Sequence, residues 1–403
     1  MRDHFPRQGT SGYTILMDVV ERTRTAFTRT GIPDRVPVHA WLGLPFLRTL
    51  VDRRYRMVDL FQMWIDDPVG TLVRYQEELG LDPMITTYSQ HIGEIELWPR
   101  MLFRYQDPAY ENWEETIVEV DRTDVSRTVQ HHIRTPAGEG SYTYRVEGYS
   151  SWLVEHLIKQ EADLDLLEYR PDPQYLLLDT LHGMIAKVGE RAWWLHHAPG
   201  PWDEAVELRG ISALSEDIHT RPQFVHRLMR VVANRLVKLY RRLGETRIHS
   251  VSLNETWVGV GLSPSVYREF VEPYDKEVVA AAHEAGLLVS YHNCGLGTSI
   301  LEDMVATGAD ALETITSATS TGDFDLADVK QRVGNRVCLF GGFNERLLTG
   351  DDQEQIRAEV RRCINAAAEG GGYILRPTGQ IFHAQPHNIQ LMARTVHNYG
   401  TYQ

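Results

Sequence analysis

The sequence is poor in cysteine. Its 403 residues include three, Cys294, Cys338 and Cys363, all in the last third of the chain. Three cysteines spread in this way form no disulfide framework, which is typical of a reducing compartment. The chain also lacks any run that approaches the ~20 apolar residues of a membrane span, and its first residues contain no apolar core of a secretory leader. We therefore expect a cytoplasmic protein that does not bind a membrane.

An excess of basic residues is missing as well. Asp and Glu number 55 against 41 Lys and Arg, so the formal net charge is −14. A chain this acidic, without a basic patch, repels nucleic acid and anionic lipid surfaces. There is no G-x-S-x-G nucleophile elbow, and Gly259 and Gly261 do not open a G-x-G-x-x-G motif. These absences argue against a nucleic-acid-binding protein, an elbow-type serine hydrolase and a nucleotide-binding enzyme.

Short runs rich in β-branched and aromatic residues alternate with helix-like stretches along most of the chain. Alternation of this kind predicts a parallel sheet covered by helices, and eight rounds of it predict a closed barrel. The predicted fold class is therefore α/β, a (β/α)8 TIM barrel with an N-terminal helical segment, and an open doubly wound sheet is the alternative. The predicted strands span residues 36–41, 84–87, 192–197, 248–255, 287–292, 309–315, 337–341 and 373–377.

One stretch breaks this alternation. Between about residues 111 and 148 the β-rich runs EETIVEV, RTVQHHIRT and YTYRVEG follow one another, with Pro136 and Gly138 at a tight turn. Such runs joined by turn residues predict an antiparallel β-hairpin. We therefore predict one domain, residues 1–403, whose barrel carries an insertion at about 105–170.

Polar and aromatic residues gather at the predicted C-terminal ends of the strands, where the catalytic residues of such barrels lie. Each alone has an ordinary structural explanation, because a histidine near a strand end is usually hydrogen-bonded and a glutamate there often caps a helix. Their joint presence at one rim predicts a site. They are His39, Trp41, His196, His197, Asn254, Glu255, Trp257, His292, Cys294, Glu313, Asn344 and Arg376.

The run LLVSYHNCG ends in His292, one spacer, Cys294 and a glycine. Residues two apart in a strand share a face, so the imidazole and the thiol can bind one metal ion, and zinc suits this donor pair. On spacing alone, a strand end where the two residues merely alternate is the better explanation. A zinc site also needs a third protein ligand. The candidates are Glu255, Glu313, Cys338 and His383.

The stretch LVSYHNCGLGTSILEDMVATGADALET resembles the uroporphyrinogen decarboxylase superfamily, and in particular its corrinoid-dependent methyltransferase branch. The segments IPDRVPV, RPQFVHRLMRVV, LSPSVYREFVEPYDKEV and PHNIQLMARTVHNYG resemble the family in the same order, so the resemblance covers roughly residues 15–400. It implies a barrel, and a zinc ion held by a His-x-Cys pair and a third ligand after the last strand. His292 and Cys294 match. Thr378 or Gly379 stands where the family has a cysteine or histidine, which leaves His383 as the substitute.

The resemblance implies a methyltransferase or demethylase that moves a methyl group between a small methylated compound, such as a methyl ether, and a corrinoid protein. The expected cofactors are zinc and a corrinoid carried by that partner protein. The oxygen of a methyl ether must be polarised before the methyl group leaves, and Glu255 or Glu313 can supply the proton. The expected catalytic residues are Glu255, Glu313 and His292; the expected substrate-binding residues are Trp41, His197, Asn254, Trp257, Asn344 and Arg376; and the expected metal ligands are His292, Cys294 and His383.

Two other functions stay open. The first is a metal-independent decarboxylase or lyase of the same superfamily, with His292 and Glu255 as acid and base, although the region VPVHAWLGLPF lacks the arginine-rich signature of the decarboxylase itself. The second is a non-catalytic protein that binds a small ligand. The expected partners are a small-molecule methyl donor or acceptor, a corrinoid protein and a second copy of the chain in a homodimer.

Overall fold

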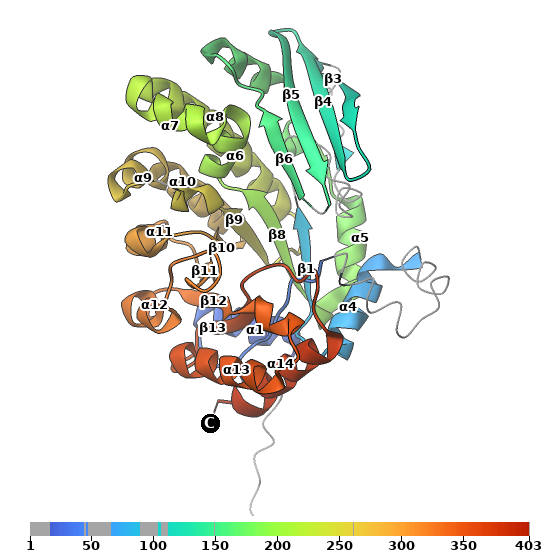
Figure 1. The fold of residues 1–403 in the computed structure, drawn as a ribbon, viewed down its shortest axis with the longest axis vertical. Coiled ribbons are helices and arrows are strands. Elements are labelled where there is room, and N and C mark those ends of the chain that lie inside the picture. Colours follow the sequence, from blue (N-terminus) through green and yellow to red (C-terminus); the bar gives the residue numbers. More distant parts are fainter. Residues whose placement is uncertain are drawn as a thin grey trace, which may run out of the picture.

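The centre of the molecule is a curled parallel sheet that is surrounded by helices (Figure 1). The computed structural model describes residues 17–43, 46, 66–88, 104–105, 112–148, 150–260 and 262–402. Seven strands form the sheet in chain order, each parallel to the next. They are β1 (Met84–Tyr88), β8 (Trp193–Pro199), β9 (Ser250–Asn254), β10 (Leu288–Asn293), β11 (Ala311–Thr314), β12 (Cys338–Phe343) and β13 (Tyr373–Pro377).

The segment around Val38 fills the eighth place in the barrel. Val38 forms a parallel bridge with Leu375 of β13, and its carbonyl oxygen accepts a hydrogen bond of 2.8 Å from the backbone of Asp82, two residues before β1. The prediction of a regular strand at 36–41 is therefore wrong. The segment makes only isolated bridges, and it contains Pro37, which has no N–H group to donate. The predicted TIM-barrel fold is confirmed.

Buried ion pairs fix this closure. Arg22, from the N-terminal helix α1 (Val19–Thr28), lies 2.8 Å from Asp82, and Arg35 lies 2.7 Å from the same carboxylate. Burial alone would raise the pKa of Asp82, but its hydrogen bond with Arg35 and the charges of both arginines lower it. Asp82 also accepts a hydrogen bond from the backbone of Val38. One ionised carboxylate thus joins α1, the closing segment and the start of β1.

The remaining helices alternate with the strands. They are α4 (Pro68–Glu78), α5 (Asp179–Val188), α6 (Pro201–Arg209), α7 (Ile211–Thr220), α8 (Pro222–Gly244), α9 (Pro264–Phe270), α10 (Glu272–Glu284), α11 (Leu301–Ala306), α12 (Leu326–Val333), α13 (Gln353–Ala367) and α14 (Pro386–Tyr399). The helices α4, α9, α12 and α13 begin after a residue whose side chain accepts hydrogen bonds from the first turn, as Asp352 does from Glu354 and Gln355. No helix in the described part of the chain combines the length and apolar composition that crossing a membrane requires.

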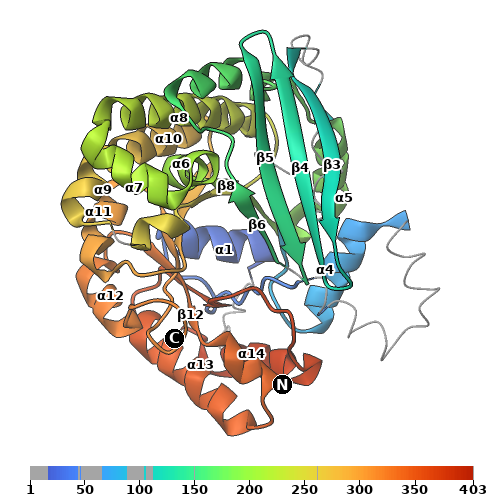
Figure 2. The ribbon, with the colours of Figure 1, turned by 45° about the horizontal axis from the view of Figure 1, so that its top comes forward.

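The predicted antiparallel hairpin is part of a larger sheet that stands beside one side of the barrel (Figures 1 and 2). The turn at Pro136 is where the sequence predicts it, between β4 and β5. A fourth strand, β6, was not predicted. The sheet consists of β3 (Glu114–Arg122), β4 (Ser126–Thr135), β5 (Gly138–Glu147) and β6 (Ser150–Glu155), and a two-stranded ladder joins β2 (Arg104–Tyr105) to β7 (Leu176–Leu177).

Candidate active site

A buried ion pair lies inside the barrel. Glu313 of β11 and Arg376 of β13 are 2% and 0% exposed, and the Nη1 group of Arg376 donates a hydrogen bond to Oε1 of Glu313. The second carboxylate oxygen accepts hydrogen bonds of 2.9 Å from Ser290 and 3.4 Å from Ser252. Burial alone would raise the pKa of Glu313, but the charge of Arg376 and the neighbouring His292 hold it well below its usual range. Glu313 is therefore an ionised, fixed carboxylate.

His292 and Cys294 lie next to this carboxylate at the end of β10. Nδ1 of His292 is 3.3 Å from Oε1 of Glu313. Burial lowers the pKa of His292, but the adjacent Cys294 and Glu313 and their charges raise it to about 9. Burial likewise opposes ionisation of the Cys294 thiol, while hydrogen bonds with His292 and Thr256 lower its pKa. The two side chains predicted to share a strand face therefore interact directly, and each stabilises the charged form of the other.

A second histidine lies on β8, which β9 separates from β10. Nδ1 of His197, on β8, is 3.0 Å from Oδ1 of Asn254, and the one hydroxyl proton of Ser252 is shared between this oxygen, at 3.1 Å, and Oε2 of Glu313. The oxygen accepts both bonds, so Nδ1 carries the proton and Nε2 is an acceptor. Burial lowers the pKa of His197 to about 4, which keeps the ring neutral. Its ring centroid lies 5.7 Å from that of His292.

Aromatic side chains pack around His197. The ring of Trp41 lies 5.2 Å from His197 and 5.6 Å from Tyr88 at the end of β1. Tyr88 and His197 are themselves 5.3 Å apart with nearly parallel rings. The guanidinium carbon of Arg376 lies 5.8 Å from the Trp41 ring centroid. Trp41 therefore packs both against Arg376 of the buried ion pair and against the aromatic rings at the ends of β1 and β8.

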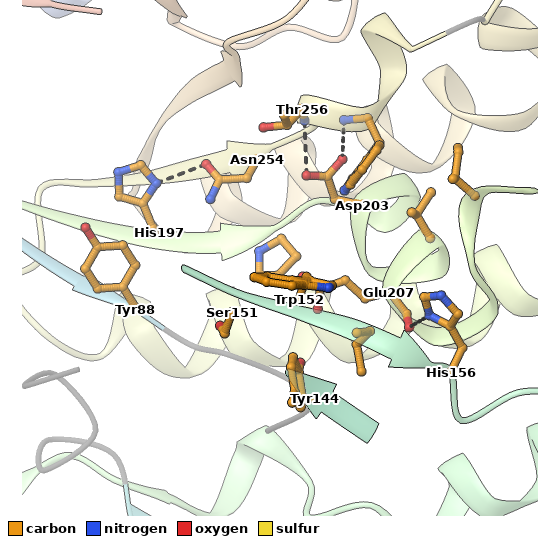
Figure 3. Close-up of a pocket in the computed structure, with 15 residues that line it drawn as sticks. Tyr88, Tyr144, Ser151, Trp152, His156, His197, Asp203, Glu207, Asn254 and Thr256 are labelled. Atoms are coloured by element: carbon orange, nitrogen blue, oxygen red, sulfur yellow. Dashed lines mark hydrogen bonds between the residues drawn. The ribbon is translucent and has the colours of Figure 1, made fainter. Parts of the chain in front are cut away.

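A cavity of about 500 Å³ opens at these strand ends (Figure 3). Its inner wall comes from the barrel, its second wall from α6, and its third wall from β5, β6 and the segment after β6. Thr256, one of its lining residues, is 3.6 Å from the sulfur of Cys294. The lining residues are Tyr88, Tyr144, Ser151, Trp152, Leu153, His156, His197, Pro199, Asp203, Val206, Glu207, Ile211, Asn254, Thr256 and Trp257.

The predicted acid Glu255 lies elsewhere. Its carboxylate accepts hydrogen bonds of 2.9 Å and 3.0 Å from the backbone N–H groups of Trp202 and Asp203, at the start of α6. Burial, together with the charges of Asp275 and Asp203, raises the pKa of Glu255 well above its usual value. Gly200 permits this contact, because a Cβ there would lie 2.2 Å from Oε1 of Glu255. The fold uses this side chain as a helix cap, and its predicted catalytic role stays a prediction.

Two other predicted residues do not join the cluster. Asn344 caps the short helix η8 (Glu345–Thr349), where its side chain accepts a hydrogen bond from Arg346. His383 is exposed in the loop between β13 and α14. Within the described residues, no group of three or more His, Cys, Asp or Glu side chains is arranged to hold a metal ion. The predicted third ligand is thus not brought to His292 and Cys294 in this structure.

Sequence reasoning missed three side chains that shape the site. Ser252 and Ser290 hold Glu313, and Tyr88 packs against Trp41. Both serines precede a predicted site residue by two positions in the same strand, so the period of two along a strand could have identified them. Tyr88 ends its strand one residue beyond the predicted limit. No sequence pattern indicated that β5 and β6 would form a wall of the cavity.

Comparison with known proteins places this site in a family context. Residues 143–399 match the family model described as "Uroporphyrinogen decarboxylase (URO-D)". Among curated proteins, the uroporphyrinogen decarboxylase of Neisseria gonorrhoeae is 25% identical over 304 residues, which cover 70% of this chain and 81% of that protein. The uroporphyrinogen decarboxylase of Cellvibrio japonicus is 26% identical over 253 residues, with 60% and 69% coverage.

A solved structure shares the fold over nearly the whole chain. It is described as a methyltransferase from Methanosarcina mazei, and it covers 95% of this chain and 99% of its own length with a TM-score of 0.64. The sequence identity is 14%, so the likeness concerns the fold.

Proposed function

Because the chain belongs to the uroporphyrinogen decarboxylase family, we propose that it is an enzyme that moves a methyl group between a small methylated compound and a corrinoid protein. What carries the proposal is the electrostatic pairing of His292 with Cys294, in which each side chain favours the charged form of the other, together with the 3.3 Å separation between Nδ1 of His292 and Glu313. A decarboxylase that works by proton transfer alone has no reaction step that requires a thiol with a lowered pKa. A thiolate beside an oriented imidazole is a donor pair that binds zinc.

The sulfur and nitrogen donors of these two side chains suit a zinc ion. Two ligands are nevertheless fewer than the three or four protein ligands of a zinc site. Cys294 offers sulfur and His292 offers Nε2, while Nδ1 faces Glu313 as in the carboxylate–histidine pairs that orient metal-bound imidazoles. When bound, such an ion polarises the heteroatom of the methylated substrate. The described residues bring no third protein ligand to this pair, so no step of the proposed reaction is assigned to the ion.

The other side chains position the substrate in this proposal. Glu313 stays ionised beside Arg376, so it orients His292 and does not act as the proton donor. Trp257 and Tyr88 offer aromatic surface to a flat compound in the cavity, and the neutral His197 offers an acceptor at its inner end. The cavity walls also reduce the access of water to the strand ends.

Decarboxylation is the second candidate, because the curated relatives are uroporphyrinogen decarboxylases. The cavity offers it little support. Uroporphyrinogen carries many carboxylates. Among the described residues that line the cavity there is no lysine or arginine, whereas Asp203 and Glu207 contribute carboxyl groups. A strongly anionic tetrapyrrole would meet no lysine or arginine among these described lining residues.

One pair of assays separates the two reactions. The purified protein is mixed with chemically reduced cob(I)alamin, as a substitute for the corrinoid protein, and with a panel of methyl ethers, methyl thioethers and methylamines. Methylcobalamin, followed by its absorption spectrum, is the expected product with at least one compound. Release of carbon dioxide from uroporphyrinogen is measured in parallel. Carbon dioxide release without methylcobalamin from any compound would reject methyl transfer in favour of decarboxylation.

A further inference from the structure

Two carboxyl groups line the cavity without forming an ion pair. Asp203 and Glu207 lie about one turn apart in α6, and both belong to the cavity lining (Figure 3). Arg170, whose charge lowers the pKa of Glu207, forms its buried ion pair with Glu204, at 2.6 Å. Among the described residues, no lysine, arginine or histidine lies within ion-pair distance of either lining carboxyl group. A carboxyl group removed from water is usually paired, so this pair indicates a ligand of positive charge.

The surroundings of the two carboxyl groups oppose their ionisation. Burial raises the pKa of Glu207 to about 7, and the charge of Glu204 adds to this rise. Burial also raises the pKa of Asp203 well above its usual value, backbone hydrogen bonds from Trp257 and Thr256 oppose the rise, and the charge of Glu207 increases it. A cation in the cavity would lower both pKa values, because an opposite charge favours the ionised form.

The same lining includes a buried acceptor that the fold does not use. His197 lines the cavity and is 1% exposed. Its Nδ1 group donates to Asn254, and its Nε2 atom has no hydrogen-bond partner among the described residues. The ring is neutral, so Nε2 accepts a hydrogen bond. Buried acceptors are nearly always satisfied, and a ligand that donates an N–H or O–H group would satisfy this one.

Aromatic rings surround the carboxyl groups on the cavity lining. Trp152 of β6, Tyr144 of β5, Trp257 and Tyr88 all belong to it. The faces of such rings attract positive charge. A metal ion such as Ca²⁺ or Mg²⁺ needs about six oxygen ligands, which this largely aromatic and apolar lining does not offer. The lining therefore favours an organic cation.

We propose that the cavity binds a small methylated ammonium cation, whose charge is held by the carboxyl groups of Asp203 and Glu207 and by the aromatic rings of the lining. This inference rests on the proposed function, because it names the substrate class for that same site. The cavity reaches the proposed reaction centre, since Thr256 on its lining is 3.6 Å from the sulfur of Cys294. The charged nitrogen of the substrate carries the methyl group that is transferred.

Equilibrium binding tests this inference without turnover. N,N-dimethylethanolamine, which is protonated at pH 8, and its neutral isostere 3-methyl-1-butanol are titrated calorimetrically into the wild-type protein. At pH 8 the carboxyl group of Glu207 is mostly ionised. Wild type is expected to bind the ammonium compound at least about tenfold more tightly than the alcohol, because a cation removed from water gains about that factor from aromatic faces alone.

Three variants complete the test. Glu207→Gln removes a charge at constant size and Trp152→Leu removes an aromatic ring, so both should reduce the preference for the ammonium compound. Glu216→Gln is the matched control, because Glu216 is exposed on α7 and lies outside the described lining. Circular dichroism checks that all variants fold. Equal affinities of wild type for the two compounds, or an unchanged preference in Glu207→Gln, overturns the inference. Methyl transfer that fails while the preference persists counts against the proposed reaction alone.

Discussion

Nδ1 of His292 lies 3.3 Å from Oε1 of Glu313, across the neighbouring strands β10 and β11. The same oxygen accepts a hydrogen bond from Arg376 of β13, so three strands meet at one buried atom. Strand pairing fixes the position of each backbone, and the carboxylate fixes the orientation of the imidazole. The site is thus built into the barrel rather than into its loops, which favours a rigid arrangement of His292 and the adjacent Cys294.

Glu313→Gln is expected to destabilise the protein strongly. The change leaves the buried guanidinium of Arg376 without its counter-charge, and removal of one partner of a buried pair costs about 3–5 kcal/mol. The free energy of unfolding is measured by urea titration. Glu302→Gln is the control, because Glu302 pairs with Arg332 at the surface, where an ion pair contributes at most about 1 kcal/mol. Equal losses in the two variants would contradict the central role of the buried pair.

Gly200→Ala should displace the cap that Glu255 provides. The new Cβ would lie 2.2 Å from Oε1 and 2.3 Å from Cδ of Glu255, so the carboxylate must move away from α6. We expect a loss of about 1–3 kcal/mol in the free energy of unfolding. Gly183→Ala, in α5, is the matched control, because a Cβ there meets nothing within 4 Å and alanine favours a helix by about 0.5–1 kcal/mol. A Gly200→Ala variant with the same free energy of unfolding as wild type would contradict the capping role of Glu255.

Asp275 should make the protein less stable as the pH rises. Burial raises the pKa of Asp275 to about 7, and Tyr291 donates a hydrogen bond of 3.0 Å to its carboxylate. A carboxyl group with a raised pKa in the folded state binds its proton more tightly there, so its stabilising contribution is complete below the unfolded pKa of about 4 and disappears as the pH approaches 7. The contribution is at most about 4 kcal/mol.

Asp275→Asn tests this pH dependence. Urea unfolding of the variant between pH 4 and pH 7 is expected to show a smaller decrease in stability with pH than wild type, because asparagine does not titrate. Asp328→Asn, on the exposed side of α12, serves as the control and should keep the wild-type slope. Parallel curves for Asp275→Asn and wild type would rule out Asp275 as the titrating group.

The sequence predicted the barrel well where strands and helices alternate. From β8 to β13 each strand lies at its predicted place, because buried parallel strands are short apolar runs between helix signals. β6 escaped prediction because Trp152 and Val154 are exposed, so apolar residues occur on both of its faces and the period of two is hidden. The segment around Val38 was predicted as a strand from composition, whereas its pairing depends on Asp82.

The site was predictable where it follows strand periodicity. His292 and Cys294 each shift the pKa of the other, whereas their spacing alone favoured two residues that merely alternate at a strand end. Glu313 lies next to His292 from the neighbouring strand. The position of Glu255 could not be read from its own strand, because it depends on Gly200 and the start of α6, more than fifty residues earlier in the chain. Only the fold likewise determines that Nε and Nη2 of Arg376 find no hydrogen-bond partner among the described residues.

Zinc content is the next prediction. Protein purified without a histidine tag is expected to contain about one zinc ion per chain, and both His292→Ala and Cys294→Ser should lose it, because each removes one donor. His383→Ala should retain the metal, since this side chain is exposed in the loop before α14. Elemental analysis gives the metal content of each variant. Metal-free wild type would remove zinc from the proposal, and loss of zinc from His383→Ala would identify the third ligand.

The central claim is that methyl transfer takes place beside Cys294. The rate of methylcobalamin formation from the best methyl donor, compared between Cys294→Ser and Cys363→Ser, tests it most directly. Cys363 is buried in α13 and its thiol donates to the backbone of Gly342, so its replacement controls for the loss of a thiol. We predict a decrease of about 100-fold or more for Cys294→Ser and a nearly unchanged rate for Cys363→Ser. A Cys294→Ser enzyme that transfers methyl groups at the wild-type rate would contradict the account.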